Sequence, residues 1–351
     1  MTEPIIRPIR SEDWEDHWAL RTQPNVVWGT LQLPTLPREV VVAQSGPQAN
    51  NYVFVAEVDG KVVGSCGIHG STSPRSRHRF GLGMSVHDAY QGRGLGKRLM
   101  AAALDLADNY LGVERVELDV YTDNPRAIHL YKSFGFEDEG IIRSMAFRDG
   151  AYVDALQMGR LRGRAAAAPR TVAPPLPSGP TGRSLPDDLN IRSVRPEDAR
   201  AIHAIFVQRG VLANLNRIPA LHLDEVKKEV SGLNWGQHMV VAETQGRVIA
   251  AAYMNQGRPG RRQHVGIIEW IAVDLEWQGC GVGTSLLQFL LNLADRWVNL
   301  KRVEWHVVAD AALGLTLGHR FEFKTEAILR SAFFRDGQFV DVCVMGRMVG
   351  L

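Results

Sequence analysis

Short runs in which apolar and polar residues alternate recur in both halves of the chain, and such runs predict β-strands. In each half, a two-residue turn separates two of these runs. The segments are 52–58, Asp59-Gly60 and 62–68 in the first half, and 239–243, Gln245-Gly246 and 248–253 in the second. Asp-Gly is a strong hairpin signal, so the sequence predicts an antiparallel hairpin in each half.

Two longer segments carry apolar residues three or four positions apart, which is helical spacing. These residues are Leu95, Leu99, Ala103 and Leu106, and then Val282, Leu286, Leu290 and Leu293. Each predicted helix follows a strand that ends at Val86 or Val273 and precedes another strand, at 116–120 or 303–308. Strands and helices mixed in this order predict an α/β fold rather than a helix bundle or a β-sandwich.

The two halves resemble each other closely enough to be copies. Gln-Gly-Arg-Gly-Leu-Gly at 91–96 returns as Gln-Gly-Cys-Gly-Val-Gly at 278–283, an offset of 187 residues. At the same offset, segments 141–161 and 328–348 are identical at 12 of 21 positions, and both contain Arg-Asp-Gly. This offset lies far outside the roughly 20–50 residue periods of solenoids and propellers. The sequence therefore predicts a duplicated domain.

A segment rich in proline, alanine and arginine divides the copies. Residues 162–190 contain six prolines and almost no large apolar side chains, so they cannot bury enough surface to fold alone. We therefore expect domains at 1–161 and 191–351, joined by a solvated linker at 162–190. The arginines of this linker suggest a nucleic-acid-binding arm as the alternative, but no aromatic residues are interleaved with them for base stacking.

Composition predicts a soluble cytoplasmic protein without a metal. The net charge of +2 gives no general attraction to nucleic acid or to an anionic membrane. No apolar stretch of about 18 residues could cross a bilayer, and the first residues lack the apolar core of a secretion signal. Cys66, Cys280 and Cys343 form no disulfide or zinc pattern, and the histidines show no HExxH spacing.

The two glycine loops predict anion-binding sites. Each follows a strand and opens a helix, so free backbone N–H groups and the positive end of the helix dipole coincide. Glycine lets a phosphate approach the backbone closely. Walker loops are excluded because Gly-Lys-Ser/Thr is missing. The residues expected around a pyrophosphate are Gln91, Gly92, Arg93, Gly94, Leu95, Gly96 and Lys97 in the first copy, and Gln278, Gly279, Cys280, Gly281, Val282, Gly283 and Thr284 in the second.

Both loops resemble the hallmark of the GCN5-related N-acetyltransferase (GNAT) family, Gln/Arg-x-x-Gly-x-Gly/Ala, and residues 120–136 resemble its signature Asn-x-x-Ala-x-x-Leu-Tyr-x-x-x-Gly-Phe. The resemblance covers nearly all of both halves. It implies two tandem domains, each with a mixed, mostly antiparallel, splayed sheet flanked by helices. It also implies that the loops bind acetyl-CoA and that the preceding strand offers backbone groups to the pantetheine arm, at Met84, Ser85 and Val86 and at Ile271, Ala272 and Val273.

The resemblance assigns roles to two residues of the second signature. It implies that Tyr131 is the general acid for the departing thiolate and that Asn124 contacts cofactor or water near the thioester. Tyr131 could equally be an amphipathic core residue, and Asn124 the N-cap of a helix that begins at Pro125. The second copy has Gly318 and Ala311 at these positions. We therefore expect turnover in the first domain and a structural, regulatory or differently catalytic second domain.

A candidate base lies only in the second copy. Glu269 precedes Val273 by four residues on the strand before the glycine loop, where family members often place a base or a water-binding carboxylate. A structural glutamate is the alternative. Leu82 stands at this position in the first copy, so the proton acceptor there is left open among His78, His87, Asp119 and ordered water.

Several other residues keep two interpretations. Lys97 either approaches a phosphate or is an exposed helix lysine. Cys280, at a helix N-terminus that lowers thiol pKa values, is either a redox switch or, as we favour, a small filler residue. Trp28 and Leu31 either wall an apolar acceptor pocket or belong to the core.

Together these features predict an N-acetyltransferase that moves the acetyl group of acetyl-CoA to a primary amine by direct attack in a ternary complex. The Tyr131 signature holds no cysteine that could form an acyl-enzyme. Free amino acids, which small bacterial relatives with segments similar to 23–34 and 148–154 acetylate, are the leading acceptors. Peptide or protein N-termini, polyamines, aminoglycosides and a CoA-binding sensor remain alternatives. The duplication also predicts an intramolecular pseudo-dimer of the two domains.

Overall fold

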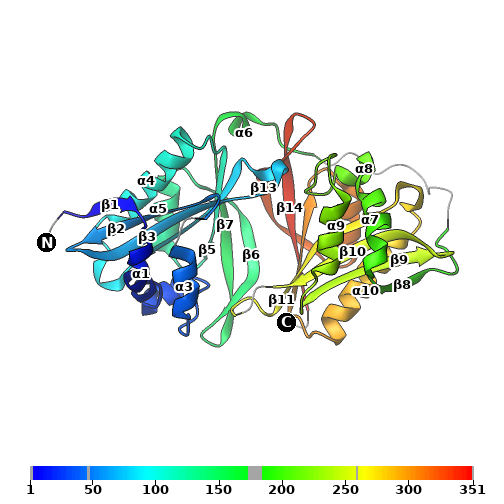
Figure 1. The fold of residues 1–351 in the computed structure, drawn as a ribbon, viewed down its shortest axis with the longest axis horizontal. Coiled ribbons are helices and arrows are strands. Elements are labelled where there is room, and N and C mark those ends of the chain that lie inside the picture. Colours follow the sequence, from blue (N-terminus) through cyan, green and yellow to red (C-terminus); the bar gives the residue numbers. More distant parts are fainter. Residues whose placement is uncertain (1–2, 46–47, 173–183, 258–259, 350–351) are drawn as a thin grey trace. The chain divides into compact units, whose positions relative to one another are not determined.

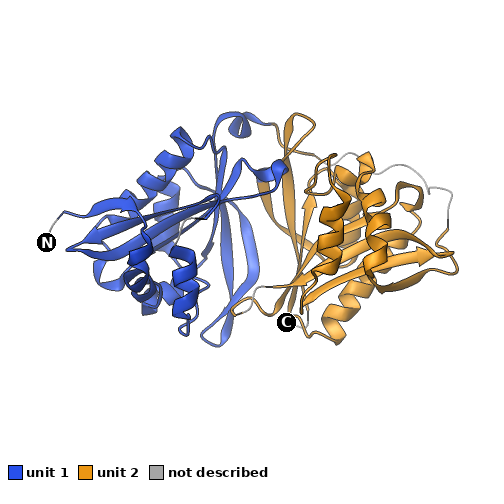
Figure 2. Ribbon diagram, viewed as in Figure 1, with its two compact units in different colours: residues 1–168, 330–332 blue, residues 169–329, 333–351 orange. Residues whose placement is uncertain are grey.

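The structure of the protein is a computed structural model that describes residues 3–45, 48–172, 184–257 and 260–349. It divides into two compact units, which Figure 2 shows in different colours. Unit 1 comprises residues 1–168 and 330–332, and unit 2 comprises residues 169–329 and 333–351. The domain limits at 161 and 191 stay a prediction, and residues 173–183 of the expected linker lie outside the described residues.

Unit 1 is built on a sheet with the strand order β1-β2-β3-β4-β5-β7-β6. Neighbouring strands are antiparallel except β4 and β5, which are parallel. The strands are β1 (Ile5–Pro8), β2 (Asn51–Val58), β3 (Lys61–Gly70), β4 (Arg79–Val86), β5 (Arg115–Tyr121), β6 (Glu137–Arg148) and β7 (Ala151–Leu161). The helices are α1 (Trp14–Arg21), α2 (Pro24–Gly29), α3 (Arg38–Ser45), α4 (Leu95–Asn109), α5 (Pro125–Ser133) and α6 (Gly163–Ala167), with 3-10 turns η1 (Ser11–Asp13), η2 (Pro74–Ser76) and η3 (Asp88–Tyr90).

Unit 2 repeats this plan with the strand order β13-β14-β12-β11-β10-β9-β8, and its one parallel pair among the described strands is β11 with β12. The strands are β8 (Asn190–Ser193), β9 (Gln237–Thr244), β10 (Arg247–Gln256), β11 (Val265–Val273), β12 (Arg302–Val308), β13 (Lys324–Arg335, of which residues 330–332 belong to unit 1) and β14 (Gln338–Met348). The helices are α7 (Ala199–Phe206), α8 (Arg209–Leu212), α9 (Leu223–Ser231), α10 (Val282–Arg296) and α11 (Ala312–Arg320), with 3-10 turns η4 (Pro196–Asp198) and η5 (Leu275–Trp277).

Both faces of each sheet are covered by helices (Figure 1). In unit 2, Ala250 and Ala252 of β10 belong to the core under α10, whereas Ala251 between them belongs to the core under α7 and α9. Successive strand residues point to opposite faces, so one strand serves both cores. Helix α4 packs on the sheet of unit 1 through Leu95, Leu99 and other buried residues, on the face that helical spacing predicts.

Both predicted hairpins form. Asp59 and Gly60 have φ angles of 51° and 77°, and Gln245 and Gly246 have φ angles of 49° and 72°. Such left-handed backbone is what a two-residue turn between antiparallel strands requires. With a mixed, mostly antiparallel sheet flanked by helices in each unit, the expected fold class is confirmed.

The expected linker differs from a plain spacer in the part that the structure describes. Residues 163–167 form α6, and the N–H of Ala165 donates to Glu114 Oε2 at 2.9 Å. At the other end, Asp188 accepts hydrogen bonds from the Thr244 hydroxyl and the Gln245 N–H. Composition could not predict these contacts, because each joins residues far apart in the sequence.

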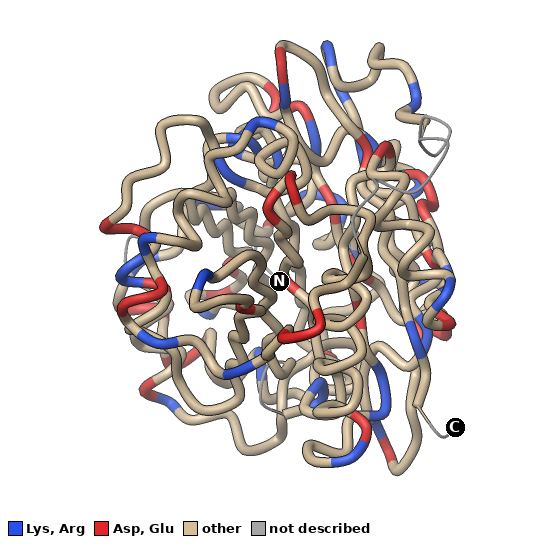
Figure 3. The backbone as a smooth tube through the Cα atoms, turned by 90° about the vertical axis from the view of Figure 1, so that its right-hand side faces the viewer, with Lys and Arg blue, Asp and Glu red and all other residues tan. Residues whose placement is uncertain are grey.

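Basic and acidic residues are interspersed along the chain (Figure 3). None of the described helices is both long and apolar enough to span a membrane. Within the same residues, no group of three or more His, Cys, Asp and Glu side chains is placed to hold a metal ion.

Candidate functional site

The candidate site lies where two parallel strands part. In unit 1, β4 and β5 are paired only at residues 79–81 and 115–117, so residues 82–86 have left β5. In unit 2, β11 and β12 are paired at 265–268 and 302–305 and separate beyond them. We call each separation a fork. Each fork opens toward the glycine loop of its unit, which is the splayed arrangement that the family resemblance implies.

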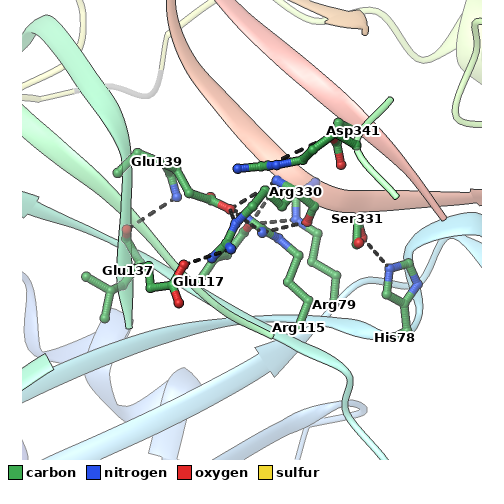
Figure 4. Close-up of polar contacts among 12 residues, drawn as sticks. His78, Arg79, Arg115, Glu117, Glu137, Glu139, Arg330, Ser331 and Asp341 are labelled. Atoms are coloured by element: carbon green, nitrogen blue, oxygen red, sulfur yellow. Dashed lines mark hydrogen bonds and ion pairs between the residues drawn. The ribbon is translucent and has the colours of Figure 1, made fainter. Parts of the chain in front are cut away.

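Buried ion pairs hold the paired end of the fork together (Figure 4). The fully buried Arg115 donates to both carboxylate oxygens of Glu139 at 2.7 Å and to Glu117 at 2.9 Å. Arg79, on the other strand, donates to Glu117 at 2.6 Å. Burial alone would raise the pKa of Glu117, but Arg79 and Arg115 lower it to about 2. Unit 2 repeats the network with Arg302, Glu304 and Glu326.

Both glycine loops have the backbone conformation that an anion site requires. Gly94 and Gly281 are the N-caps of α4 and α10, with φ angles of 80° and 102°. This left-handed region favours glycine. The N–H groups in the first turn of a helix have no acceptor within the helix, so donors and the positive end of the dipole meet at the loop.

The two loop glutamines, which the sequence predicts as cofactor contacts, brace the loops from within. Gln91 Nε2 donates to the Val86 carbonyl at 3.2 Å, and Gln278 Nε2 donates to the Val273 carbonyl at 3.0 Å. In each unit the bond ties the end of the strand to the start of the loop. The side chain therefore shapes the glycine loop in both copies.

Positive charge surrounds the loop of unit 1. Arg93 and Lys97 are exposed beside it, as expected from the sequence. Arg126 of α5 reaches the loop as well: it donates to Gln91 Oε1 at 3.1 Å and lies 3.8 Å from the place of a Cβ on Gly92. Sequence analysis missed Arg126, because only the fold brings α5 to the loop.

The loop of unit 2 is neutral and partly covered. At the equivalent positions, Arg93, Lys97 and Arg126 are replaced by Cys280, Thr284 and Leu313. Cys280 is buried and its thiol donates to the Trp277 carbonyl at 2.9 Å, which fits the filler role. Leu185 covers the loop: its methyl carbon lies 3.4 Å from the place of a Cβ on Gly281.

The strand residues expected at the pantetheine arm lie on the open arm of each fork. Those that are half-buried are Met84, Ser85, Val86, Ile271 and Val273, and Ala272 is buried. The side chains of Leu95 and Val282 point into the cores, which leaves only their backbone at the loop. A Cβ on Gly96 would lie 3.5 Å from Met84 and 3.2 Å from Leu130, so β4, α4 and α5 converge here.

Tyr131 lies on α5 and is 8% exposed. Its ring centroid is 5.9 Å from that of Phe136. No described residue makes a hydrogen bond with its hydroxyl. Burial, and then the nearby Cys66, raise the pKa of Tyr131, so the phenol carries its proton at neutral pH. The hydroxyl therefore keeps its proton and can donate a hydrogen bond to a group that lies beside it.

Asn124 performs the structural role that the sequence allows. It is the N-cap of α5, and its Oδ1 accepts from the Ala127 N–H at 3.1 Å. Its Nδ2 lies 3.5 Å from the place of a Cβ on Gly29 at the end of α2. Contact between Asn124 and the cofactor stays a prediction. At the N-cap of α11, Ala311 provides no such bond.

The three candidate bases of unit 1 lie at different places along the fork. His78 precedes β4 at the paired end, where burial lowers its pKa and its Nε2 lies 2.8 Å from the Ser331 carbonyl. His87 follows β4 at the loop end, and its Nδ1 accepts from a backbone N–H at 3.2 Å. Asp119 is exposed on β5, two residues beyond Glu117, and so lies on the open arm.

Glu269 is the first residue of β11 beyond the paired part of its fork. Its side chain is exposed at the surface, yet the surrounding chain keeps enough water away to raise the pKa of its carboxyl. His306, the next residue of β12, lies on the opposite arm, with its Nε2 2.9 Å from Glu304. At the equivalent positions of unit 1 stand Leu82 and Asp119.

Comparison with known proteins gives a family and several relatives. The model of the acetyltransferase (GNAT) family matches residues 10–136 and 214–316, together more than half of the chain. The L-amino acid N-acetyltransferase AaaT of Escherichia coli K12 is 36% identical over 162 residues, which are 46% of this chain and 100% of that relative. The N-alpha-acetyltransferase RimI of Mycobacterium tuberculosis is 41% identical over 113 residues, 32% of this chain and 66% of the relative. A crystal structure of a GNAT acetyltransferase from Streptococcus pneumoniae is 27% identical with a TM-score of 0.42, covering 46% of this chain and 100% of its own.

Proposed function

Because this chain belongs to the acetyltransferase (GNAT) family, we propose that its first unit transfers the acetyl group of acetyl-CoA to the amino group of a free amino acid. The family and the relatives establish an N-acetyltransferase that uses acetyl-CoA. The L-amino acid N-acetyltransferase AaaT is matched over the whole of its own length, which supports amino acids as acceptors.

The difference in charge between the two glycine loops carries the choice of unit. Phosphate groups bind most strongly where charged donors add to backbone N–H groups. The loop of unit 1 has Arg93, Lys97 and Arg126 around it. The loop of unit 2 has neutral residues at these positions, and Leu185 lies against Gly281. Unit 1 is therefore the better site for a CoA phosphate.

Tyr131 also supports unit 1 as the catalytic unit, because unit 2 has Gly318 at the equivalent position. Acetyl-CoA provides the thioester. The neutral amine forms a bond to the carbonyl carbon as the carbon–sulfur bond breaks, and the Tyr131 hydroxyl donates its proton to the departing thiolate. The surplus proton of the amine leaves through a base on the open arm of the fork, where Asp119 lies.

We expect Tyr131→Phe to lower kcat about 100-fold, the lower end of general-acid contributions. The dissociation constant for CoA should stay unchanged, because the loop that binds the phosphates is intact. Release of the CoA thiol from acetyl-CoA with a panel of L-amino acids measures the first quantity, and calorimetry the second. Tyr110→Phe is the control, because Tyr110 is 76% exposed at the end of α4.

A matched pair of loop variants tests the choice of unit. Gly94 and Gly281 both have a positive φ angle, so valine would strain the loop in either unit. Gly94→Val should abolish turnover and Gly281→Val should leave it intact. The opposite result, with an active Tyr131→Phe, would assign the reaction to unit 2. CoA binding without turnover of any amine would favour a sensor, and acetylation of peptides alone would exclude free amino acids as acceptors.

A further inference from the structure

The Arg-Asp-Gly motif places one arginine of unit 1 at a fixed position. Asp149 and Gly150 have φ angles of 50° and 81° and form the tight turn between β6 and β7. Arg148 is the last residue of β6 and pairs with Ala151 across this turn. Its side chain is 6% exposed. A charge so well removed from water requires partners, and they come from α2, from the end of β5 and from the turn before α5.

The guanidinium of Arg148 is held by an ion pair, a carbonyl and two aromatic rings. Nη1 and Nη2 donate to the two carboxylate oxygens of Asp123, and Nη1 lies 3.4 Å from the Trp28 carbonyl. Its Cζ atom lies 4.1 Å from the ring centroid of Trp28 and 4.9 Å from that of Tyr121. Aromatic faces attract a guanidinium, so both rings stabilise this position.

These contacts join α2 to the start of the helix that carries Tyr131. Trp28 belongs to α2, and Asp123 directly precedes the N-cap of α5, Asn124. Tyr121 at the end of β5 adds a second tie, because its hydroxyl donates to the Thr30 carbonyl at 3.1 Å, just beyond α2. Through Arg148, α2 and α5 are therefore fixed to one another beside the open arm of the fork.

Unit 2 keeps the ion pair of this arrangement and lacks its rings. Arg335 pairs with Asp310, and its Nη1 donates to the Ala213 carbonyl at 3.2 Å. Ala213 takes the place of Trp28, because its carbonyl contacts Arg335 as the Trp28 carbonyl contacts Arg148, and Val308 stands 187 residues after Tyr121. The ion pair is thus common to both copies, whereas the rings occur in the copy that also has Tyr131.

We propose that Arg148 is a positioning residue for acetyl transfer, which holds α2, through Trp28, against the start of α5 and so sets the acceptor side of the site. This inference rests on the proposed function of unit 1. Lysine cannot replace arginine fully at such a place, because it lacks the planar group that bonds a carboxylate twice and stacks on rings.

Arg148→Met should lower kcat/KM for the amino acid roughly 100-fold, the size expected when a reacting group is displaced by about 1 Å. The effect should appear in kcat and in KM for the amino acid, with the dissociation constant for CoA within about twofold of wild type. Arg148→Lys should restore part of the loss. Arg335→Met removes the equivalent ion pair of unit 2 and should change neither kcat nor KM for the amino acid.

Trp28→Leu is the second test, because it keeps the ion pair and removes one ring. It should raise KM for the amino acid in the same direction as Arg148→Met, and it decides the question if Arg148→Met fails to fold. If Arg148→Met folds and has wild-type kinetic constants, the positioning role is overturned. If Arg148→Met does not fold, wild-type constants in Trp28→Leu overturn it. In either case an inactive Tyr131→Phe would leave the proposed function standing. A wild-type enzyme that acetylates no amino acid would instead overturn the proposed function.

Discussion

Buried titratable residues of unit 1 are ionised or neutral according to the partners that surround them. Glu117 has two arginines and stays ionised. His17 of α1 is 7% exposed, and its Nδ1 has no hydrogen-bond partner in the part of the chain that the structure describes. Burial, and then the nearby Arg21, lower the pKa of His17 to about 4. His17 is therefore neutral in the folded protein at physiological pH.

The low pKa of His17 predicts a loss of stability in mild acid. The unfolded chain binds a proton at about pH 6.5 and the folded chain only near pH 4, so the contribution is complete above pH 6.5 and is lost as the pH falls toward 4. From about pH 7 to about pH 5, this amounts to about 2 kcal/mol. Urea unfolding of wild type and His17→Leu at both pH values measures it. An equal loss in both proteins would contradict the assignment.

Site residues with a local signal were predictable from the sequence, whereas residues that only the fold brings together were not. Tyr131 and Asn124 belong to one contiguous signature. Arg126 and Arg148 act on residues 35 and 25 positions away, which no spacing rule connects. Gln91 lies at the predicted loop, but its side chain bonds the strand. A sequence motif gives the place of a residue better than the direction of its side chain.

At the scale of elements, α5 and α11 are equivalent helices of the two units that differ in their N-cap residue. The first begins with Asn124, whose side chain accepts a bond from the first turn, and the second begins with Ala311, whose side chain cannot. The two N-caps have similar ψ angles of 67° and 73°. An asparagine therefore fits at the second start as well, because the backbone already has the conformation that the cap requires.

This comparison predicts two substitutions with opposite effects. Asn124→Ala should destabilise unit 1 by about 1 kcal/mol, because a first-turn N–H loses its acceptor. Ala311→Asn should stabilise unit 2 by a similar amount for the converse reason. Urea unfolding of each variant gives the change in free energy. A loss of stability in Ala311→Asn would show that contacts around α11, rather than its cap, set its stability.

Elements were predictable where a strong turn signal or a long amphipathic pattern marked them. The hairpin turns and the helices α4 and α10 follow from such signals. The short helices α2 and α3 were not predicted, because six or eight residues are marginal as isolated helices. Their formation depends on contacts with the rest of the unit, such as the bond from the Asn25 N–H of α2 to Asp88 at 3.1 Å and the bond from Arg21 to Gln44 of α3 at 2.6 Å.

At the scale of the whole molecule, the duplication gives each unit a core of its own. Leu99 of α4 and Leu286 of α10 are equivalent residues, and both are completely buried, in different cores. Proteins with several domains often depart from two-state unfolding. Packing of the two units as a pseudo-dimer stays a prediction, as does the absence of nucleic acid among the partners.

Thermal unfolding with and without CoA can show which of the two units binds the cofactor. Leu99→Ala and Leu286→Ala should each cost about 2–5 kcal/mol in their own unit, as other buried leucines do. CoA should raise the unfolding temperature of the unit that binds it, which on our proposal is the one that Leu99→Ala weakens. Calorimetric scans of both variants with and without CoA test this. A shift confined to the transition that Leu286→Ala weakens would place the cofactor in unit 2.

The bonds from Gln91 to Val86 and from Gln278 to Val273 bear on how the cofactor is captured. Because side chains of the protein itself make these bonds, the loops are preorganised before a phosphate binds. Little backbone entropy is then lost on binding. If unit 1 binds CoA as proposed, we expect diffusive encounter to limit the rate of binding, and we expect Arg93, Lys97 and Arg126 beside Gly92 to accelerate that encounter by attracting the phosphate groups.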